Sequence, residues 1–204
     1  MTTEQSSTLR RHLPSAPLAL ALLLVIIGSA AGFVYSGVYD IGADAPHSRL
    51  VYAMLEQFRD RAIVHHARGL IVPYDLNDPK RVAAGAALYS EMCTGCHLAP
   101  GIGPTELSKG LYPAAPELAR GDDLTAPQQF WVVKHGVKLS AMPAWGKTHD
   151  DQLIWDMVAF IRHMPGMNAQ QLQKIVASAP EDHDEMMEHM GAPQPAQALA
   201  RHGK

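Results

Sequence analysis

The chain has little cysteine and little charge, and each shortage excludes a class of protein. Only two of its 204 residues are cysteines, too few for a disulfide scaffold or for a site with four cysteine ligands to zinc or an iron–sulfur cluster. Charged residues make up 18% of the chain, with 17 basic and 20 acidic side chains. This balance predicts no nucleic-acid partner. No alternating strand pattern is present, so an all-α fold is expected.

One long segment near the start lacks charge altogether. No Asp, Glu, Lys or Arg lies between Arg11 and Asp40, and residues 18–38 are almost entirely apolar. A membrane-spanning helix needs about 20 such residues, so we predict a single transmembrane anchor over residues 18–39. Because Arg10 and Arg11 precede it, the positive-inside rule places residues 1–17 in the cytoplasm. The chain that follows the anchor then lies on the opposite, extracytoplasmic side of the membrane.

The same segment also fits a cleaved signal peptide. Ser29, Ala30 and Ala31 are small residues of the kind that signal peptidases accept. Apolar and aromatic residues continue to Tyr39, however, as they do at the interfacial end of a retained anchor. A retained anchor is therefore our interpretation, with cleavage as the alternative.

The remaining chain divides into three parts. Residues 40–75 hold an amphipathic helix, from about Ser48 to Arg68, and a linker. Residues 76–167 form a helical domain whose first helix begins at Asp78-Pro79, with further helices over 128–138 and after a Thr148 cap. Residues 168–204 form a polar extension that we expect to be disordered beyond Pro180.

Both cysteines fall within five residues of sequence, Cys93-Thr94-Gly95-Cys96-His97. This is the spacing that attaches a c-type haem covalently. One helical turn places the two thiols on the same side, where each can add across a haem vinyl group, and directs the next imidazole at the iron.

Three other readings of the cysteine pair are weaker. A thioredoxin-like pair lies at the junction of a strand and a helix, and no strand is predicted here. A zinc site needs two further ligands. A plain disulfide leaves His97 without a role.

These residues, with three other segments, resemble the class I c-type cytochromes, specifically the membrane-anchored bacterial monohaem kind. The resemblance covers about residues 76–166 and rests on Gly85-Ala86-Ala87-Leu88-Tyr89, the haem motif, Met142-Pro143-Ala144-Trp145 and Met157-Val158-Ala159-Phe160-Ile161. It implies a haem domain of packed helices after the anchor, one haem c, and His97 and Met142 as the two iron ligands. It also implies that Gly85 and Tyr89 cross Met157 and Phe160.

The chain's own residues also favour Met142 as a ligand. A thioether is a soft neutral donor, and Met142 stands in a loop between two helices. Met54, Met92 and Met157 fall on apolar helical stripes, so we expect them in the core. His135 is the alternative ligand, although its apolar neighbours indicate a packing helix.

A second set of residues is expected to support the site. A ligating histidine donates its other ring N–H to a carbonyl group, and in the family a proline after the motif supplies that group. Pro116 is the best match, with Pro113 and Pro104 as alternatives. Three lysines near Met142 suggest a positive rim for an acidic redox partner, or ordinary surface charge: Lys134, Lys138 and Lys147.

The polar extension contains soft metal ligands. Two histidines and three methionines occur in eight residues: His183, Met186, Met187, His189 and Met190. They suit copper, so copper binding is one hypothesis, and a solvated or partner-contacting tail is the other.

Together these features predict a single-electron carrier and not an enzyme. It would be tethered to the inner membrane with its haem domain in the periplasm, and it would serve respiratory complexes or other membrane-bound or periplasmic redox proteins. The alternatives are a permanent subunit of an oxidase or reductase, a copper-handling haem protein, and a haem sensor or peroxidase-like enzyme without Met142 on the iron.

Overall fold

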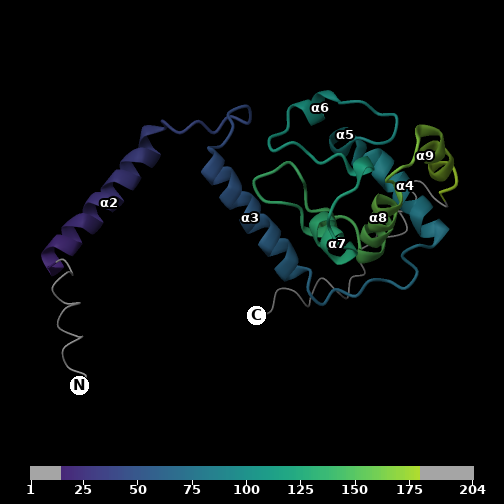
Figure 1. Ribbon diagram of the computed structural model, residues 1–204, viewed down its shortest axis with the longest axis horizontal. Coiled ribbons are helices and arrows are strands. Elements are labelled where there is room, and N and C mark those ends of the chain that lie inside the picture. The colour runs from purple at the N-terminus through teal and green to yellow at the C-terminus, as the bar shows by residue number, and fades with distance from the viewer. Residues whose placement is uncertain (1–14, 180–204) are drawn as a thin grey trace, which may run out of the picture. The chain divides into compact units, whose positions relative to one another are not determined.

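The computed structural model describes residues 15–179, so most of the predicted cytoplasmic segment 1–17 lies outside the described residues. The chain separates into two units, Met1–Ala45 and Pro46–Lys204. The first contains helix α2 (Ala16–Ser36), coloured purple in Figure 1. A window of 18 residues within it has a mean hydropathy of 2.4, and among the described helices α2 is the one that is long and apolar enough to span a membrane.

Helix α2 ends before the predicted limit of the anchor at residue 39. Gly37, at φ 62°, takes the left-handed conformation that terminates helices, and its N–H donates to the carbonyl of Val34. The apolar residues beyond Gly37 therefore follow the helix without extending it.

The second unit is helical, and its described residues form no β-sheet. It is built from α3 (Arg49–His66), α4 (Pro79–Met92), α5 (Thr94–His97), α6 (Glu106–Lys109), α7 (Ala126–His135), α8 (Asp151–His163) and α9 (Ala169–Val176). Two short 3-10 helices, η1 (Leu118–Arg120) and η2 (Trp145–Lys147), lie in the loops. This confirms the predicted all-α class.

Helices α4 and α8 cross at the centre of the core, as the resemblance implied. A Cβ at Gly85 would lie 1.8 Å from the backbone oxygen of Asp156, so the two helices meet where one residue has no side chain. Next to this crossing, the rings of Tyr89 and Phe160 pack with centroids 5.2 Å apart. Both rings are fully buried, and so is Met157.

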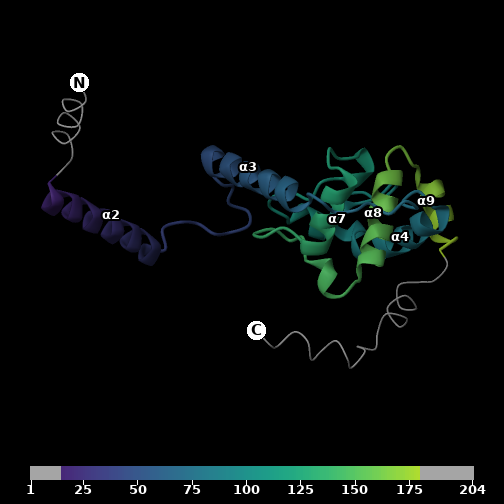
Figure 2. The same ribbon diagram turned by 90° about the horizontal axis from the view of Figure 1, so that it is seen from below.

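Other helices cover this central pair. Helix α7 packs on α8, where the rings of Phe130 and Trp155 stack at 4.3 Å. Helix α9 lies beside α4 and buries Leu172, and Figures 1 and 2 both show it there. The helical unit therefore continues past the predicted boundary at residue 167.

Helix α3, which corresponds to the amphipathic helix predicted from about Ser48 to Arg68, belongs to this same unit. Its Ile63 is buried, and its His66 ring stacks on Trp131 of α7 at 5.5 Å with 9° between the planes. Met54, however, is exposed on the outer side of α3, so the prediction that it fills the core is wrong. A helical stripe indicates one preferred face but does not say which residues a neighbour covers.

A partly buried ion pair links the core helices at the end away from the cysteines. The guanidinium of Arg81 contacts the carboxylate of Asp156 and lies 3.0 Å from that of Asp75. Burial raises the pKa of Asp156 to about 6, although Arg81 acts in the opposite direction. The raised value makes this carboxylate sensitive to mildly acidic pH.

Helices α7 and α8 begin at residues other than those predicted, because a different residue caps the N-terminus of each helix. Asp150, not Thr148, caps α8: its carboxylate accepts from the N–H of Leu153, and a carboxylate also suits the positive end of the helix dipole. Helix α7 begins at Ala126 and not near 128, because the N–H of Thr125 just before it donates to the side-chain oxygen of Gln128 at 2.8 Å.

Candidate functional site

The Cys93–His97 segment forms a single tight turn at the end of α4. Cys93 ends α4, and its carbonyl accepts from the N–H of Cys96 at 3.1 Å and from that of His97 at 2.8 Å. Thr94 reinforces the turn by donating its hydroxyl to the carbonyl of Ser90. Local hydrogen bonding alone therefore brings the two thiols and the imidazole together.

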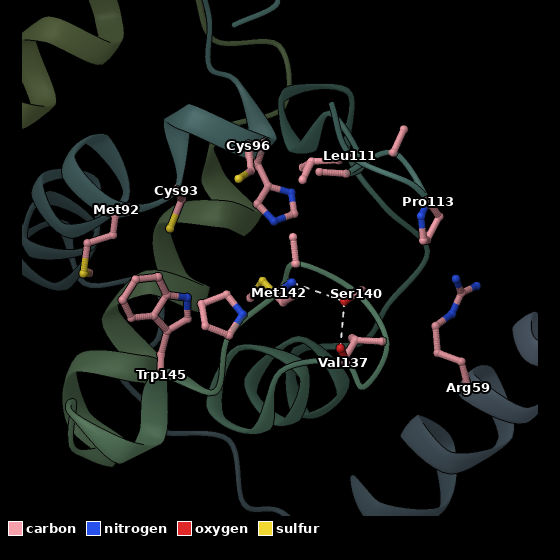
Figure 3. Close-up of a pocket in the computed structure, with 15 residues that line it drawn as sticks. Arg59, Met92, Cys93, Cys96, Leu111, Pro113, Val137, Ser140, Met142 and Trp145 are labelled. Atoms are coloured by element: carbon pink, nitrogen blue, oxygen red, sulfur yellow. Dashed lines mark hydrogen bonds between the residues drawn. The ribbon is translucent and has the colours of Figure 1, made fainter. Parts of the chain in front are cut away.

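Both thiols line a pocket, and no disulfide joins them. In Figure 3 the sulfur atoms of Cys93 and Cys96 lie on one side of the pocket, near its upper left. Burial raises the pKa of the Cys93 thiol to about 12, and Cys96 adds to the effect. A thioredoxin-type nucleophile needs a lowered thiol pKa, so this environment does not suit that chemistry.

The ring of His97 is held from outside the motif. Its Nδ1 lies 2.9 Å from the carbonyl oxygen of Pro116, nineteen residues further along the chain. Because a carbonyl only accepts, Nδ1 must carry the proton, and Nε2 keeps its lone pair for a metal. Of the three prolines considered, Pro116 is the one at hydrogen-bond distance. Pro113 instead lines the pocket.

Met142 lies across the pocket from the cysteines, on the loop between α7 and η2 (Figure 3). A small network holds its backbone. The hydroxyl of Ser140 accepts from the N–H of Met142 at 3.2 Å and donates to the carbonyl of Val137 at 2.7 Å. The N–H of Val137 in turn donates to the carbonyl of Met142 at 3.2 Å.

Gly136 completes this support, although no role in the site was predicted for it. Its φ of +65° suits glycine, and a Cβ there would lie 2.6 Å from the carbonyl oxygen of Met142 and 2.7 Å from that of Pro143. The methionine loop therefore rests directly on the backbone at the end of α7. A glycine a few residues before a loop methionine was the available signal.

The alternative ligand His135 does not line the pocket. It is exposed at the end of α7, where its ring packs on Trp131 at 5.2 Å. Met92 does line the pocket, on the cysteine side. Among the described residues no three His, Cys, Asp or Glu side chains are grouped to hold a metal ion. The proposed copper ligands between His183 and Met190 lie outside the described residues.

The pocket is mainly apolar and holds about 680 Å³ of open space, its mouth included. Its wall is formed by Arg59, Met92, Cys93, Cys96, His97, Leu111, Pro113, Ala114, Ala115, Val137, Ser140, Ala141, Met142, Pro143 and Trp145. Two thiols on one side, an imidazole with a fixed tautomer and a facing thioether fit a covalently attached haem.

This fold and this pocket define a c-type cytochrome domain. Over residues 80–161 the chain matches the family described as Cytochrome C oxidase, cbb3-type, subunit III. The match includes nearly all of α4, the Cys93–His97 turn, Met142 and most of α8, and it covers less than half of the chain. It confirms the expected cofactor, haem c with its iron, and haem-based electron transfer as the kind of activity. No curated protein matches the chain significantly, and no solved structure does.

Proposed function

We propose that this protein is a membrane-tethered carrier of single electrons whose one haem is bound by Cys93 and Cys96 and ligated by His97 and Met142. The observation that carries the proposal is the pocket itself, where an imidazole with a free Nε2 and a thioether share one apolar cavity. Haem c supplies a reversible one-electron iron couple when it is bound.

Each residue has a defined task in this proposal. The carbonyl of Pro116 keeps His97 in the tautomer that presents Nε2 to a metal. The hydrogen bonds of Ser140 and the close packing of the loop against Gly136 fix the position of the Met142 backbone beside the pocket. A neutral thioether opposite an imidazole favours a higher potential than a second imidazole does.

The arrangement supports a carrier and not an enzyme. Histidine and methionine on the two sides would leave no position at which a substrate molecule binds iron. Tethering through α2 would raise the local concentration of membrane-bound redox partners. With Arg10 and Arg11 before the anchor, the positive-inside rule favours a periplasmic haem domain.

The test is an equilibrium redox titration of the purified full-length protein, followed by exposure of the reduced form to carbon monoxide. We expect a single reversible one-electron transition and no change in the haem spectrum with carbon monoxide, which needs a vacant iron position. Rapid carbon monoxide binding together with turnover of peroxide would contradict the carrier role and favour the sensor or peroxidase alternative.

A second candidate function is a permanent cytochrome subunit of an oxidase or reductase, which the name of the matched family favours. Native gel electrophoresis of gently solubilised membranes, stained for haem, separates the two. A free carrier migrates near the size of its 22.1 kDa chain plus detergent. A subunit migrates with a much larger assembly that also consumes oxygen or another acceptor.

A further inference from the structure

Arg59 differs from every other residue that lines the pocket. Of the fifteen lining residues, all of them described, it alone carries a permanent charge. It stands on α3, which precedes the 80–161 segment that matches the cytochrome family. Its position in the pocket is therefore a property of this chain's additional helix and not of the matched domain.

Helix α3 is fixed to the haem domain at both ends. Just before its start, the N–H of His47 donates to the hydroxyl of Tyr112 at 3.0 Å, and the two rings pack at 5.5 Å. Near its end, His66 stacks on Trp131. Arg59 lies between these two attachments, so its approach to the pocket is set by packing.

The chemistry of haem explains what a cation would do there. The two vinyl groups that react with cysteine thiols occupy one edge of the porphyrin, and the two propionate groups occupy the opposite edge. Figure 3 shows Arg59 projecting from α3 toward the pocket from the side away from Cys93 and Cys96. A carboxylate removed from water needs a charged or hydrogen-bonding partner, and guanidinium binds carboxylates through paired donors.

The ion pairs that Arg59 forms in the structure do not prevent its guanidinium from binding a further carboxylate. Its Nε lies 2.8 Å from the carboxylate of Asp60, and Nη2 lies 2.8 Å from the same carboxylate and 3.7 Å from that of Glu56. The side chains of Asp60 and Glu56 are 61% and 41% exposed, and exposed pairs of this kind contribute little stability. The donors of Nη1 remain for another carboxylate.

We propose that Arg59 binds a haem propionate, that α3 thereby closes the propionate edge of the pocket, and that this contact raises the midpoint potential of the haem. A positive charge held near the iron favours the ferrous form, which has one positive charge fewer than the ferric form. The proposal rests on the haem site and is independent of whether the protein is a free carrier or a subunit.

The experiment compares Arg59→Gln, Arg59→Lys and Arg61→Gln in the full-length holoprotein. Arg61 is the matched control, because it is exposed on the same helix and does not line the pocket. We expect Arg59→Gln to raise the ferric-to-ferrous ratio at a fixed potential about threefold to tenfold, which lowers the midpoint by roughly 30–60 mV for one electron. Arg59→Lys should restore part of the shift, and Arg61→Gln should change the ratio less than twofold.

Haem content and resonance Raman spectra complete the test. Equal haem per chain in all variants, with propionate vibrations that change only in the Arg59 variants, supports the contact. Equal potential shifts in Arg59→Gln and Arg61→Gln, or unchanged propionate vibrations, would overturn it while leaving the electron-carrier proposal intact. A wild-type protein without a reversible haem couple would instead defeat the proposed function.

Discussion

Gly85 lies where α4 and α8 cross, and among the described glycines it leaves the least room for an added side chain. In an isolated helix, alanine is favoured over glycine by about 1 kcal/mol, so Gly85→Ala would be stabilising if the position were open. A Cβ there would instead lie 1.8 Å from the backbone oxygen and 2.4 Å from the carbonyl carbon of Asp156, and 3.0 Å from Cβ of Phe160. Ordinary contacts between carbon atoms are about 3.5–4.0 Å.

Relieving this overlap requires the two helices to separate, because the nearest atoms belong to backbone. Overpacking of a core costs about 1–3 kcal/mol, and occasionally more. The separation also removes dispersion contacts around the fully buried Tyr89 and Phe160. Because the overlap at Gly85 is with backbone atoms, we expect a cost above the usual range, about 3–5 kcal/mol. After the gain of about 1 kcal/mol in helix propensity, the free energy of unfolding should fall by about 2–4 kcal/mol. For a domain of about 100 residues this lowers Tm by roughly 10–30 °C.

Thermal unfolding of the purified full-length protein, followed by far-ultraviolet circular dichroism, measures the loss. Gly103→Ala is the control, because nothing lies within 4 Å of a Cβ at that position, and it should change the unfolding free energy by less than about 0.5 kcal/mol. If Gly85→Ala unfolded at the same temperature as Gly103→Ala, the close approach of the two helices would be refuted.

Three further predictions concern single contacts. Tyr89→Phe removes the hydroxyl that donates to the carbonyl of Leu98 at 2.7 Å, and we expect a loss of about 1–3 kcal/mol in chemical denaturation because that carbonyl is left without its partner. Gly136→Ala forces the Met142 loop away from α7, which should weaken the iron–methionine charge-transfer band in the oxidised spectrum; an unchanged band would contradict the packing. Burial raises the pKa of Asp156 to about 6, so between pH 4 and pH 6 the native state holds a proton that the unfolded chain has released, and stability falls as the pH rises through this window. The decrease is at most about 3 kcal/mol, and denaturant titrations of Asp156→Asn should show a flatter pH dependence than those of the wild-type protein.

Features set by neighbouring residues were predictable from the sequence. The Cys93–His97 turn needs only local hydrogen bonds, and Asp78 caps α4 next to Pro79 as expected. The membrane-spanning candidate follows from composition alone. In each case the physical cause lies within one or two helical turns of the residue.

Features that depend on the path of the chain were harder to predict. Three prolines fitted the carbonyl partner of His97, and only the folded loop places one of them, Pro116, at 2.9 Å. The amphipathic pattern predicted the helix that became α3, but an apolar stripe does not identify the surface on which a helix packs. The structure shows that Ile63 and His66 hold this helix on the domain while Met54 faces outward. This packing of α3 was not predictable from the sequence pattern. It brings Arg59 to the pocket.

We assign to this protein one haem c, bound by Cys93 and Cys96, with His97 and Met142 on its iron. A pyridine haemochrome spectrum and the oxidised spectra of wild-type, Met142→His and Met92→Leu proteins test this assignment, since Met92 also lines the pocket. We predict one haem with two thioether bonds per chain in all three proteins, and an iron–methionine charge-transfer band that only Met142→His loses. A haem spectrum without two thioether bonds, or a band that survives in Met142→His, would contradict this assignment of the haem ligands.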